Sequence, residues 1–247
     1  MNVLVAVSLA GSLKSYIEPK YLEMASACID PLENVDTIVY GNKGLGNYEF
    51  RYCDIGGNGW ADDVIYATHQ AALDDAKRLG YDKVVFQGVD CLYNSRQDFE
   101  SLISHDKDIV GAITMGRKAP EYTVVRDWKI KNGKVTREQF DIICDPKKEN
   151  LQRCGFPGTE ACVINKNCFD IPIANPKYRM WYSTEDKDIY LCVHEFFMYE
   201  AAKLGKEVYC DTSIRTWHAD DSGNAHRWLS RPVRNENLFW RGDTLEI

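Results

Sequence analysis

Short apolar runs and amphipathic stretches alternate through residues 1–115, and this alternation restricts the fold more than any other feature of the chain. The apolar runs, each of a length typical of a buried strand, are residues 2–8 (NVLVAVS), 35–40 (VDTIVY), 82–87 (DKVVFQ) and 108–114 (DIVGAIT). The stretches with helical spacing are residues 19–29, 62–79 and 97–104. Strands that alternate with helices form a mostly parallel sheet with helices on its faces. We therefore predict an α/β fold of this kind.

A different pattern in the second half of the chain predicts a smaller, β-rich unit. Asn132-Gly133 stands between two short runs of strand type and indicates a hairpin. We expect a strand at residues 158–165, a long helix at residues 186–204, and two closing strands at residues 207–211 and 214–217. Residues 41–59 and 141–153 are polar, and we expect them to be irregular loops.

The composition excludes several classes of protein. Aromatic residues make up 12% of the chain, too many for a disordered protein. The formal net charge of -7 argues against broad, charge-driven binding of nucleic acid. No apolar run reaches the roughly 18–20 residues that span a bilayer, and the apolar N-terminus has no basic region, so it predicts a first strand rather than a signal peptide. We therefore expect a cytoplasmic protein without a transmembrane segment.

The spacing of the nine cysteines matches no common disulfide framework or zinc site. Their number is odd and no pair is spaced C-x-x-C, so a set of disulfides is not expected in a chain without a signal peptide. The spacing of Cys144, Cys154, Cys162 and Cys168 matches no common zinc site. We interpret the cysteines as small buried residues in a reducing compartment.

Several catalytic signatures are absent from the sequence. The P-loop pattern G-x-x-x-x-G-K-[ST] does not occur, and residues 8–12 (SLAGS) stand where a dinucleotide-binding fold has G-x-G-x-x-G. Neither G-x-S-x-G nor H-E-x-x-H is present. These absences count against P-loop NTPases, NAD-dependent enzymes, α/β-hydrolases and zinc proteases.

One acid stands directly after a predicted strand. Asp90 follows the run at residues 82–87, in Gly88-Val89-Asp90. The carboxyl ends of the strands form the usual ligand crevice of an α/β sheet. A carboxylate there suits Mg²⁺ or Mn²⁺, which prefer oxygen ligands. The alternative is an aspartate that only caps the following turn.

The order of the segments resembles that of GT-A-type nucleotide-sugar glycosyltransferases, of the kind typified by glycosyltransferase family two. The segments that carry this resemblance are Asn2–Ser12, Ala67–Tyr93, Gly155–Asn165 and Val193–His218. They correspond in turn to the family's first strand, the helix and strand before its D-x-D metal motif, its acceptor-side glycine turn, and its closing helix, strand and histidine. The resemblance implies a GT-A-like (Rossmann-like) sheet flanked by helices, with a small β-rich acceptor-side half and a C-terminal tail.

The resemblance also implies the residues of the site. The D-x-D motif keeps only its last acid, so Asp90 is the expected metal ligand, together with His218 at the end of the closing strand. A packed histidine without a ligand role is the alternative for His218. The expected general base is Asp188, followed by Glu195 and Asp186. The positions expected to contact the donor are Val7, Ser8, Ala10, Gly41, Asp63, Gly88, Val89 and Arg227.

The implied reaction transfers a sugar from a UDP- or GDP-sugar to an acceptor hydroxyl. It depends on Mn²⁺ or Mg²⁺, and direct displacement aided by a carboxylate base would invert the anomeric carbon. Two alternatives remain open: a nucleotidyltransferase on a related fold, and an inactive nucleotide-sugar-binding protein. The acceptor could be a glycan, a protein or a modified nucleic-acid base.

The domain division follows from the same correspondence. We expect one catalytic domain at residues 1–218, with a nucleotide-sugar-binding half at 1–115 and an acceptor-side half at 116–218. Residues 219–247 are rich in arginine and tryptophan, and we expect a tail that closes as a lid over the donor or packs on the domain or on a second subunit.

Overall fold

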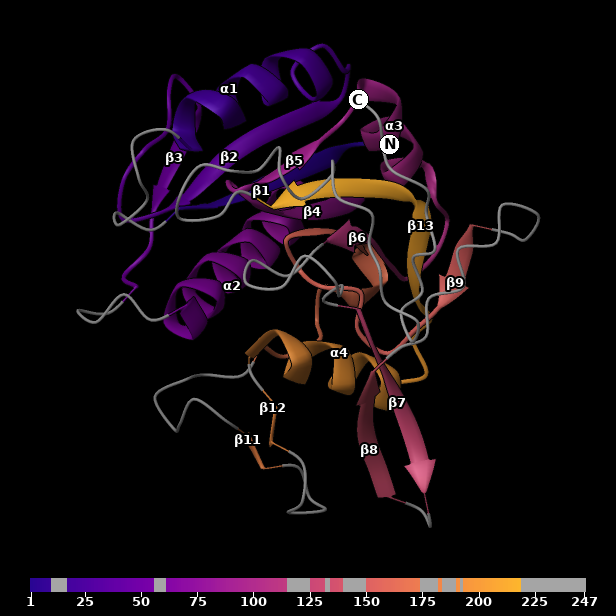
Figure 1. Ribbon diagram of the computed structural model, residues 1–247. Coiled ribbons are helices and arrows are strands. Elements are labelled where there is room, and N and C mark those ends of the chain that lie inside the picture. Colours follow the sequence, from indigo (N-terminus) through magenta and orange to yellow (C-terminus); the bar gives the residue numbers. More distant parts are fainter. Residues whose placement is uncertain are drawn as a thin grey trace.

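The computed structural model describes residues 1–9, 17–55, 61–114, 125–131, 134–139, 150–173, 182–183, 190–191 and 193–218. Across these residues a nine-stranded sheet has the order β3-β2-β1-β4-β10-β6-β13-β5, and β9 also pairs with β13 (Figure 1). Its strands are β1 (Val3–Leu9), β2 (Val35–Gly41), β3 (Glu49–Tyr52), β4 (Lys83–Gly88), β5 (Cys91–Tyr93), β6 (Ile109–Thr114), β9 (Leu151–Arg153), β10 (Ala161–Asn165) and β13 (Val208–His218). The helices are α1 (Ile17–Cys28), α2 (Ala61–Leu79), α3 (Arg96–Ser104) and α4 (Val193–Lys203).

The sheet is mixed but mostly parallel. Strands β1, β2, β3, β4, β6 and β13 run in one direction, whereas β5, β9 and β10 run in the other. The predicted α/β class is therefore confirmed. Strand β10 lies between β4 and β6 and is antiparallel to both. The second half of the chain thus contributes a strand to the middle of the sheet, next to the strand that precedes Asp90.

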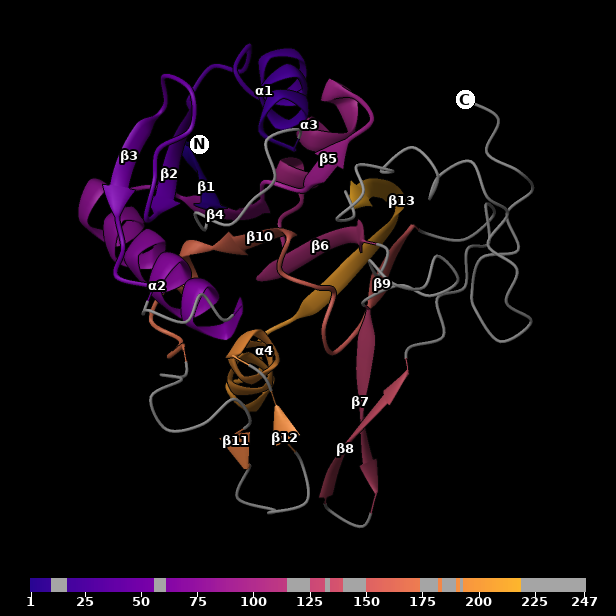
Figure 2. The ribbon, with the colours of Figure 1, turned by 60° about the vertical axis from the view of Figure 1, so that its left-hand side comes forward.

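Helices cover both faces of the sheet (Figures 1 and 2). Helices α1 and α3 share a core with Val3, Val5 and Val7 of β1, whereas α2 and α4 share a second core with Leu4 and Ala6. Successive side chains of a strand point to opposite faces, so a strand covered on both sides is apolar at every position. This explains the uninterrupted apolar run near the start of the chain.

Two short antiparallel pairs complete the described part of the fold. The predicted hairpin is confirmed as β7 (Arg126–Lys131) and β8 (Lys134–Gln139), which project from the sheet (Figure 1). Strands β11 (Tyr182–Ser183) and β12 (Tyr190–Leu191) form the second pair, before α4. Among the described residues, no helix has both the length and the apolar character that a membrane span requires.

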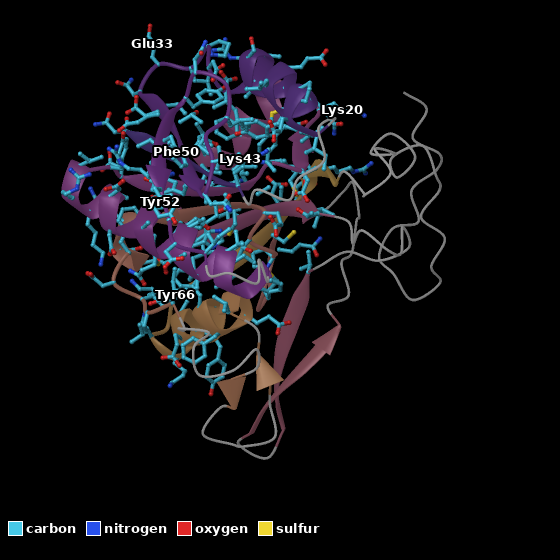
Figure 3. The ribbon with its side chains drawn as sticks, turned by 90° about the vertical axis from the view of Figure 1, so that its left-hand side faces the viewer. Lys20, Glu33, Lys43, Phe50, Tyr52 and Tyr66 are labelled. Atoms are coloured by element: carbon cyan, nitrogen blue, oxygen red, sulfur yellow. The ribbon has the colours of Figure 1, made fainter. Side chains whose placement is uncertain are left out.

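The prediction of two irregular loops is partly wrong. Strand β3 lies within residues 41–59, and β9 lies within residues 141–153. Strand β3 is an edge strand whose Phe50 and Tyr52 are 36% and 71% exposed (Figure 3), so it lacks the apolar pattern of a buried strand. Strand β9 has three residues, none of them fully buried. Short and exposed edge strands give no apolar periodicity to detect.

Helix α4 begins later than predicted. It starts at Val193, not at residue 186, because Tyr190 and Leu191 belong to strand β12. Positions 186 and 188, which we predicted in its first turn, precede this helix and lie outside the described residues.

The two predicted closing strands are one strand, β13. Its register against β6 shifts between Asp211 and Arg215. The Asp211 carboxylate accepts hydrogen bonds from the backbone N–H and the hydroxyl of Ser213, at 2.9 and 2.6 Å. This local bonding lets a polar segment continue as an irregular part of a strand instead of forming a loop.

Candidate active site

The carboxyl ends of β1, β2 and β4 meet at one edge of the sheet. Ser8 of β1 is in register with Tyr40 of β2 and Gly88 of β4, and the next residue of β1 is in register with Gly41. The Ser8 and Thr68 hydroxyls form a hydrogen bond of 2.9 Å that joins β1 to α2. The structure therefore brings Ser8, Gly41 and Gly88 together at the edge where α/β folds bind ligands.

Three of the predicted donor-binding positions have evident structural roles. A Cβ atom at Gly41 would overlap the carbonyl oxygen of Leu9, so a glycine is needed where β1 and β2 end. Val7 and Val89 are 0% and 3% exposed and belong to the core shared with α1 and α3. Their side chains pack in the core, so only their backbone atoms are left to contact a ligand.

Asp90 lies in the turn directly after β4, and only 4% of it is exposed. With Cys91 and Glu160 it forms what we call the carboxylate cluster, whose potential ligand atoms all lie within 4.8 Å of one another. Gln87 supports the turn, because its Nε2 donates to the carbonyl oxygens of Gly88 at 2.8 Å and Cys91 at 2.5 Å. The sequence-predicted metal ligand is thus held in a buried, hydrogen-bonded turn.

The carboxylate cluster has the chemistry of a divalent-cation site. Two carboxylates this close repel each other, and a cation between them supplies the charge that stabilises both. Carboxylate oxygens are the preferred protein ligands of Mg²⁺ and Mn²⁺. The Cys91 thiol is a softer group and contributes less to such a site. The residues present therefore fit the cation that the resemblance implies.

Glu160 is the member of the cluster that the sequence alone does not reveal. Strand β10 pairs with β4 so that Ala161 faces Gln87, and the Gly88 N–H donates to the Glu160 carbonyl oxygen at 2.8 Å. Glu160 therefore stands directly opposite Gly88 across the ladder. In the sequence, glycine stands at position 88, where the D-x-D motif has its first acid. This shows that an acid is missing, but it does not show which other residue supplies a carboxylate.

Strand β13 brings its end to the same place. The ladder between β13 and β5 pairs His218 with Cys91, the residue after Asp90. The backbone of His218 therefore lies beside the carboxylate cluster, although the two residues are far apart in sequence. Of His218, the structure describes the backbone alone.

Of the three predicted general bases, the structure describes only Glu195. Glu195 lies in the first turn of α4 and is buried, with 6% exposed. Phe197, two residues on, packs edge-on against Phe86 of β4 with ring centroids 6.2 Å apart, so α4 covers this part of the sheet. Only the backbone of Asp63, in the first turn of α2, is described. The predicted site residues outside the described part of the chain are Ala10, Asp186, Asp188 and Arg227.

Buried thiols elsewhere in the structure are not suited to a zinc site. Burial raises the pKa of the Cys168 thiol to about 12, and burial also raises the pKa of Cys162. A zinc ligand must be a thiolate, which this environment disfavours. The interpretation of these cysteines as small core residues agrees with their burial.

Comparisons with known proteins give similar solved structures but no similar sequence. No protein-family model matches the chain, and no curated protein sequence matches it. The structure of GalNAc-T7 with UDP, GalNAc and Mn²⁺ matches with a TM-score of 0.58 and 8% identity, over 88% of this chain and 44% of that one. A putative nucleotide-diphospho-sugar transferase from Desulfovibrio desulfuricans G20 matches with a TM-score of 0.45 and 11% identity, over 96% and 90%. The inositol-1-phosphate CTP transferase from T. maritima matches with a TM-score of 0.43 and 10% identity, over 86% and 85%.

These likenesses concern the fold. The chain has an α/β fold with a mixed, mostly parallel sheet flanked by helices, and the match to GalNAc-T7 makes this fold GT-A-like, as the sequence predicts. It spans less than half the length of GalNAc-T7.

Proposed function

We propose that this chain transfers a sugar from a nucleoside-diphosphate sugar to an acceptor hydroxyl. The observation that carries the proposal is the pairing of Asp90 with Glu160 at the carboxyl end of β4, on a GT-A-like fold. Oxygen ligands at this edge suit a cation that in turn binds phosphate oxygens. The structural neighbour with the TM-score of 0.58 was solved with UDP and Mn²⁺, which supports a UDP-sugar and Mn²⁺ as the first donor and cation to test.

The donor would lie along the edge formed by β1, β2 and β4. Ser8 and Gly41 mark the ends of adjacent parallel strands there, and Gly88 and Val89 offer backbone groups beside them. We propose that Ala10 and Asp63 contact the base or ribose and that Arg227 contacts the diphosphate, because arginine binds such anions through two donors at once.

Asp90 and His218 would hold the divalent cation. When bound, the cation neutralises the charge that develops on the leaving nucleoside diphosphate. The protein would hold the carboxylates in position before the donor binds. Burial of Asp90 and the two hydrogen bonds from Gln87 to its turn serve that purpose, because a preorganised site costs no rearrangement during the reaction.

A carboxylate would take the proton of the attacking hydroxyl. We propose Asp188 for this role, with Glu195 and Asp186 as the next candidates. A general base must lie within hydrogen-bond reach of the acceptor oxygen. Glu195 lies in the first turn of α4, whose Phe197 packs against Phe86 of β4, and this supports it as the alternative to Asp188. Direct displacement with such a base inverts the anomeric carbon.

We further propose that residues 1–218 act as one catalytic domain. Strand β13, near the end of this range, pairs with β6 of the first half, so the two halves share one sheet. Residues 219–247 would close over the donor as a lid. The acceptor would be a glycan, a protein or a modified nucleic-acid base.

The experiment is a donor screen with the full chain, with Mn²⁺ or with a chelator. UDP- and GDP-sugars are incubated with the protein, and nucleoside diphosphate and free sugar are measured. Release from one donor that depends on Mn²⁺ and is abolished in Asp90→Ala and His218→Ala supports the proposal. Pyrophosphate release from a nucleoside triphosphate and a sugar phosphate would instead indicate a nucleotidyltransferase. Donor binding without release would indicate a binding protein.

A further inference from the structure

Gly88 is a glycine for a reason other than backbone conformation. Its φ angle is not among the positive values, which in the described residues belong to Asn34 and to other glycines. Its position at the end of β4 is one that any L-residue can adopt. The reason for the glycine must therefore lie in the space around it.

That space is filled by the carboxylate of Glu160, the residue directly before β10. A Cβ atom built at Gly88 would overlap Oε2 of Glu160 and would lie 3.4 Å from its Cδ and 2.9 Å from Oδ1 of Asp90. Directly opposite residues of an antiparallel pair point to the same face, with Cβ atoms about 4.5–5.5 Å apart. Glutamate is long enough to cross this distance and place its carboxylate over position 88.

We propose that Glu160, the residue directly before β10, supplies the cation-binding carboxylate that position 88 of β4 lacks. The motif that the resemblance implies has acids at positions 88 and 90, whereas here the carboxylate beside Asp90 comes from Glu160, directly before β10. The site thus keeps two carboxylates close together, although the linear motif contains only one. The inference rests on the proposed function for the presence of a cation, and it assigns a ligand that the linear motif does not contain.

The geometry explains why both acids would not occur together. An aspartate at position 88 would meet the carboxylate of Glu160 at its own Cβ and would add a further negative charge beside Asp90. The small residue at 88 and the acid at 160 are therefore a matched pair, and exchanging them should preserve the site.

Direct binding of Mn²⁺ tests the assignment without relying on catalysis. The full chain is titrated with Mn²⁺, with and without UDP, and free Mn²⁺ is measured by electron paramagnetic resonance. We expect Glu160→Gln, which keeps the size of the side chain and removes its charge, to weaken binding by roughly tenfold or more. The matched control is Glu33→Gln, because Glu33 is exposed in the turn before β2, at the opposite end of the strands (Figure 3), and should bind like the parent.

The exchange variant, Gly88→Asp combined with Glu160→Ala, tests whether a carboxylate at position 88 can replace the one at position 160. Gly88→Asp alone should lose binding and stability, because the two acids collide. Gly88→Asp with Glu160→Ala should bind Mn²⁺ within about threefold of the parent, since one carboxylate again faces Asp90. Circular dichroism and thermal unfolding identify variants that fail to fold. Because Glu160→Gln removes no packing volume, it remains informative even if the exchange variant is unstable.

Each result decides the proposal. Unchanged Mn²⁺ affinity in Glu160→Gln overturns it, as does a parent chain that binds no Mn²⁺ in either condition. A folded exchange variant that stays as weak as Glu160→Gln also overturns the equivalence of the two positions. If the exchange restores Mn²⁺ binding but no donor releases its sugar, the ligand assignment stands and the proposed transferase function fails.

Discussion

Gly111 is a second position where space, not backbone conformation, requires a glycine. It lies in β6 and pairs with Cys162 of β10 and Cys210 of β13. A Cβ atom there would lie 2.5 Å from Cβ and 2.9 Å from Cγ of Pro157. Carbon atoms in contact sit roughly 3.5–4.0 Å apart, so Gly111→Ala demands a movement of about 1 Å between a rigid ring and a strand that is paired on both sides.

The expected cost follows from two opposing terms. Overpacking of a core costs about 1–3 kcal/mol, and replacing a strand glycine with alanine recovers about 0.5–1 kcal/mol. We therefore expect Gly111→Ala to lower the free energy of unfolding by about 1–2 kcal/mol, or Tm by roughly 2–8 °C in a chain of this size. Gly44→Ala is the matched control, because its Cβ would meet Phe50 at an ordinary 3.8 Å.

The same substitution should disturb the carboxylate cluster. Pro157 is followed by Gly158, whose φ of 96° turns the chain toward Glu160. Pushing the proline ring should therefore move Glu160 and weaken Mn²⁺ binding along with stability. Urea unfolding followed by tryptophan fluorescence measures the first effect, and Mn²⁺ titration measures the second. A Gly111→Ala protein as stable as Gly44→Ala would refute the reasoning about packing.

Two further predictions concern the support of the sheet. Lys83 is buried and donates from Nζ to the carbonyl oxygens of Ile103 and His105, at 2.8 and 2.7 Å, so Lys83→Met should cost about 2–3 kcal/mol in urea unfolding. A change below about 0.5 kcal/mol would show that these bonds contribute little. Burial raises the pKa of Asp75, but hydrogen bonds from Arg78 and two other side chains outweigh it and hold the pKa below its usual value. The contribution of Asp75 is therefore present above about pH 4 and is lost as the pH falls further, so the stability difference from Asp75→Asn should shrink in acid unfolding and should stay constant if the pKa is not lowered.

The buried strands of the sheet could be predicted because each of them shows its burial in its own short segment of sequence. Strands β1, β4 and β6 are buried at nearly every position and are rich in apolar residues. Helix α2 is followed by Gly80, whose φ of 78° is the left-handed conformation of a helix stop. Asp90 could be predicted for the same reason, since it directly follows one of these strands.

The remaining features depend on contacts between distant residues. The position of Glu160 opposite Gly88 is set by the register of β10 against β4, which neither segment encodes alone. The late start of α4 depends on the pairing of Tyr190 and Leu191 with β11. A local pattern cannot show such a pairing, because the same residues would also suit a helix.

The measurement that tests the central claim most directly is Mn²⁺-dependent release of nucleoside diphosphate from a UDP-sugar, compared between the parent chain and Asp90→Asn. Asn preserves the size of the buried side chain while removing its charge. We predict release by the parent with Mn²⁺, none after chelation, and a loss of at least about a hundredfold in Asp90→Asn without a change in fold. Equal release by the parent and Asp90→Asn, or release that persists under chelation, would contradict the assignment of a cation-binding transferase site to the end of β4.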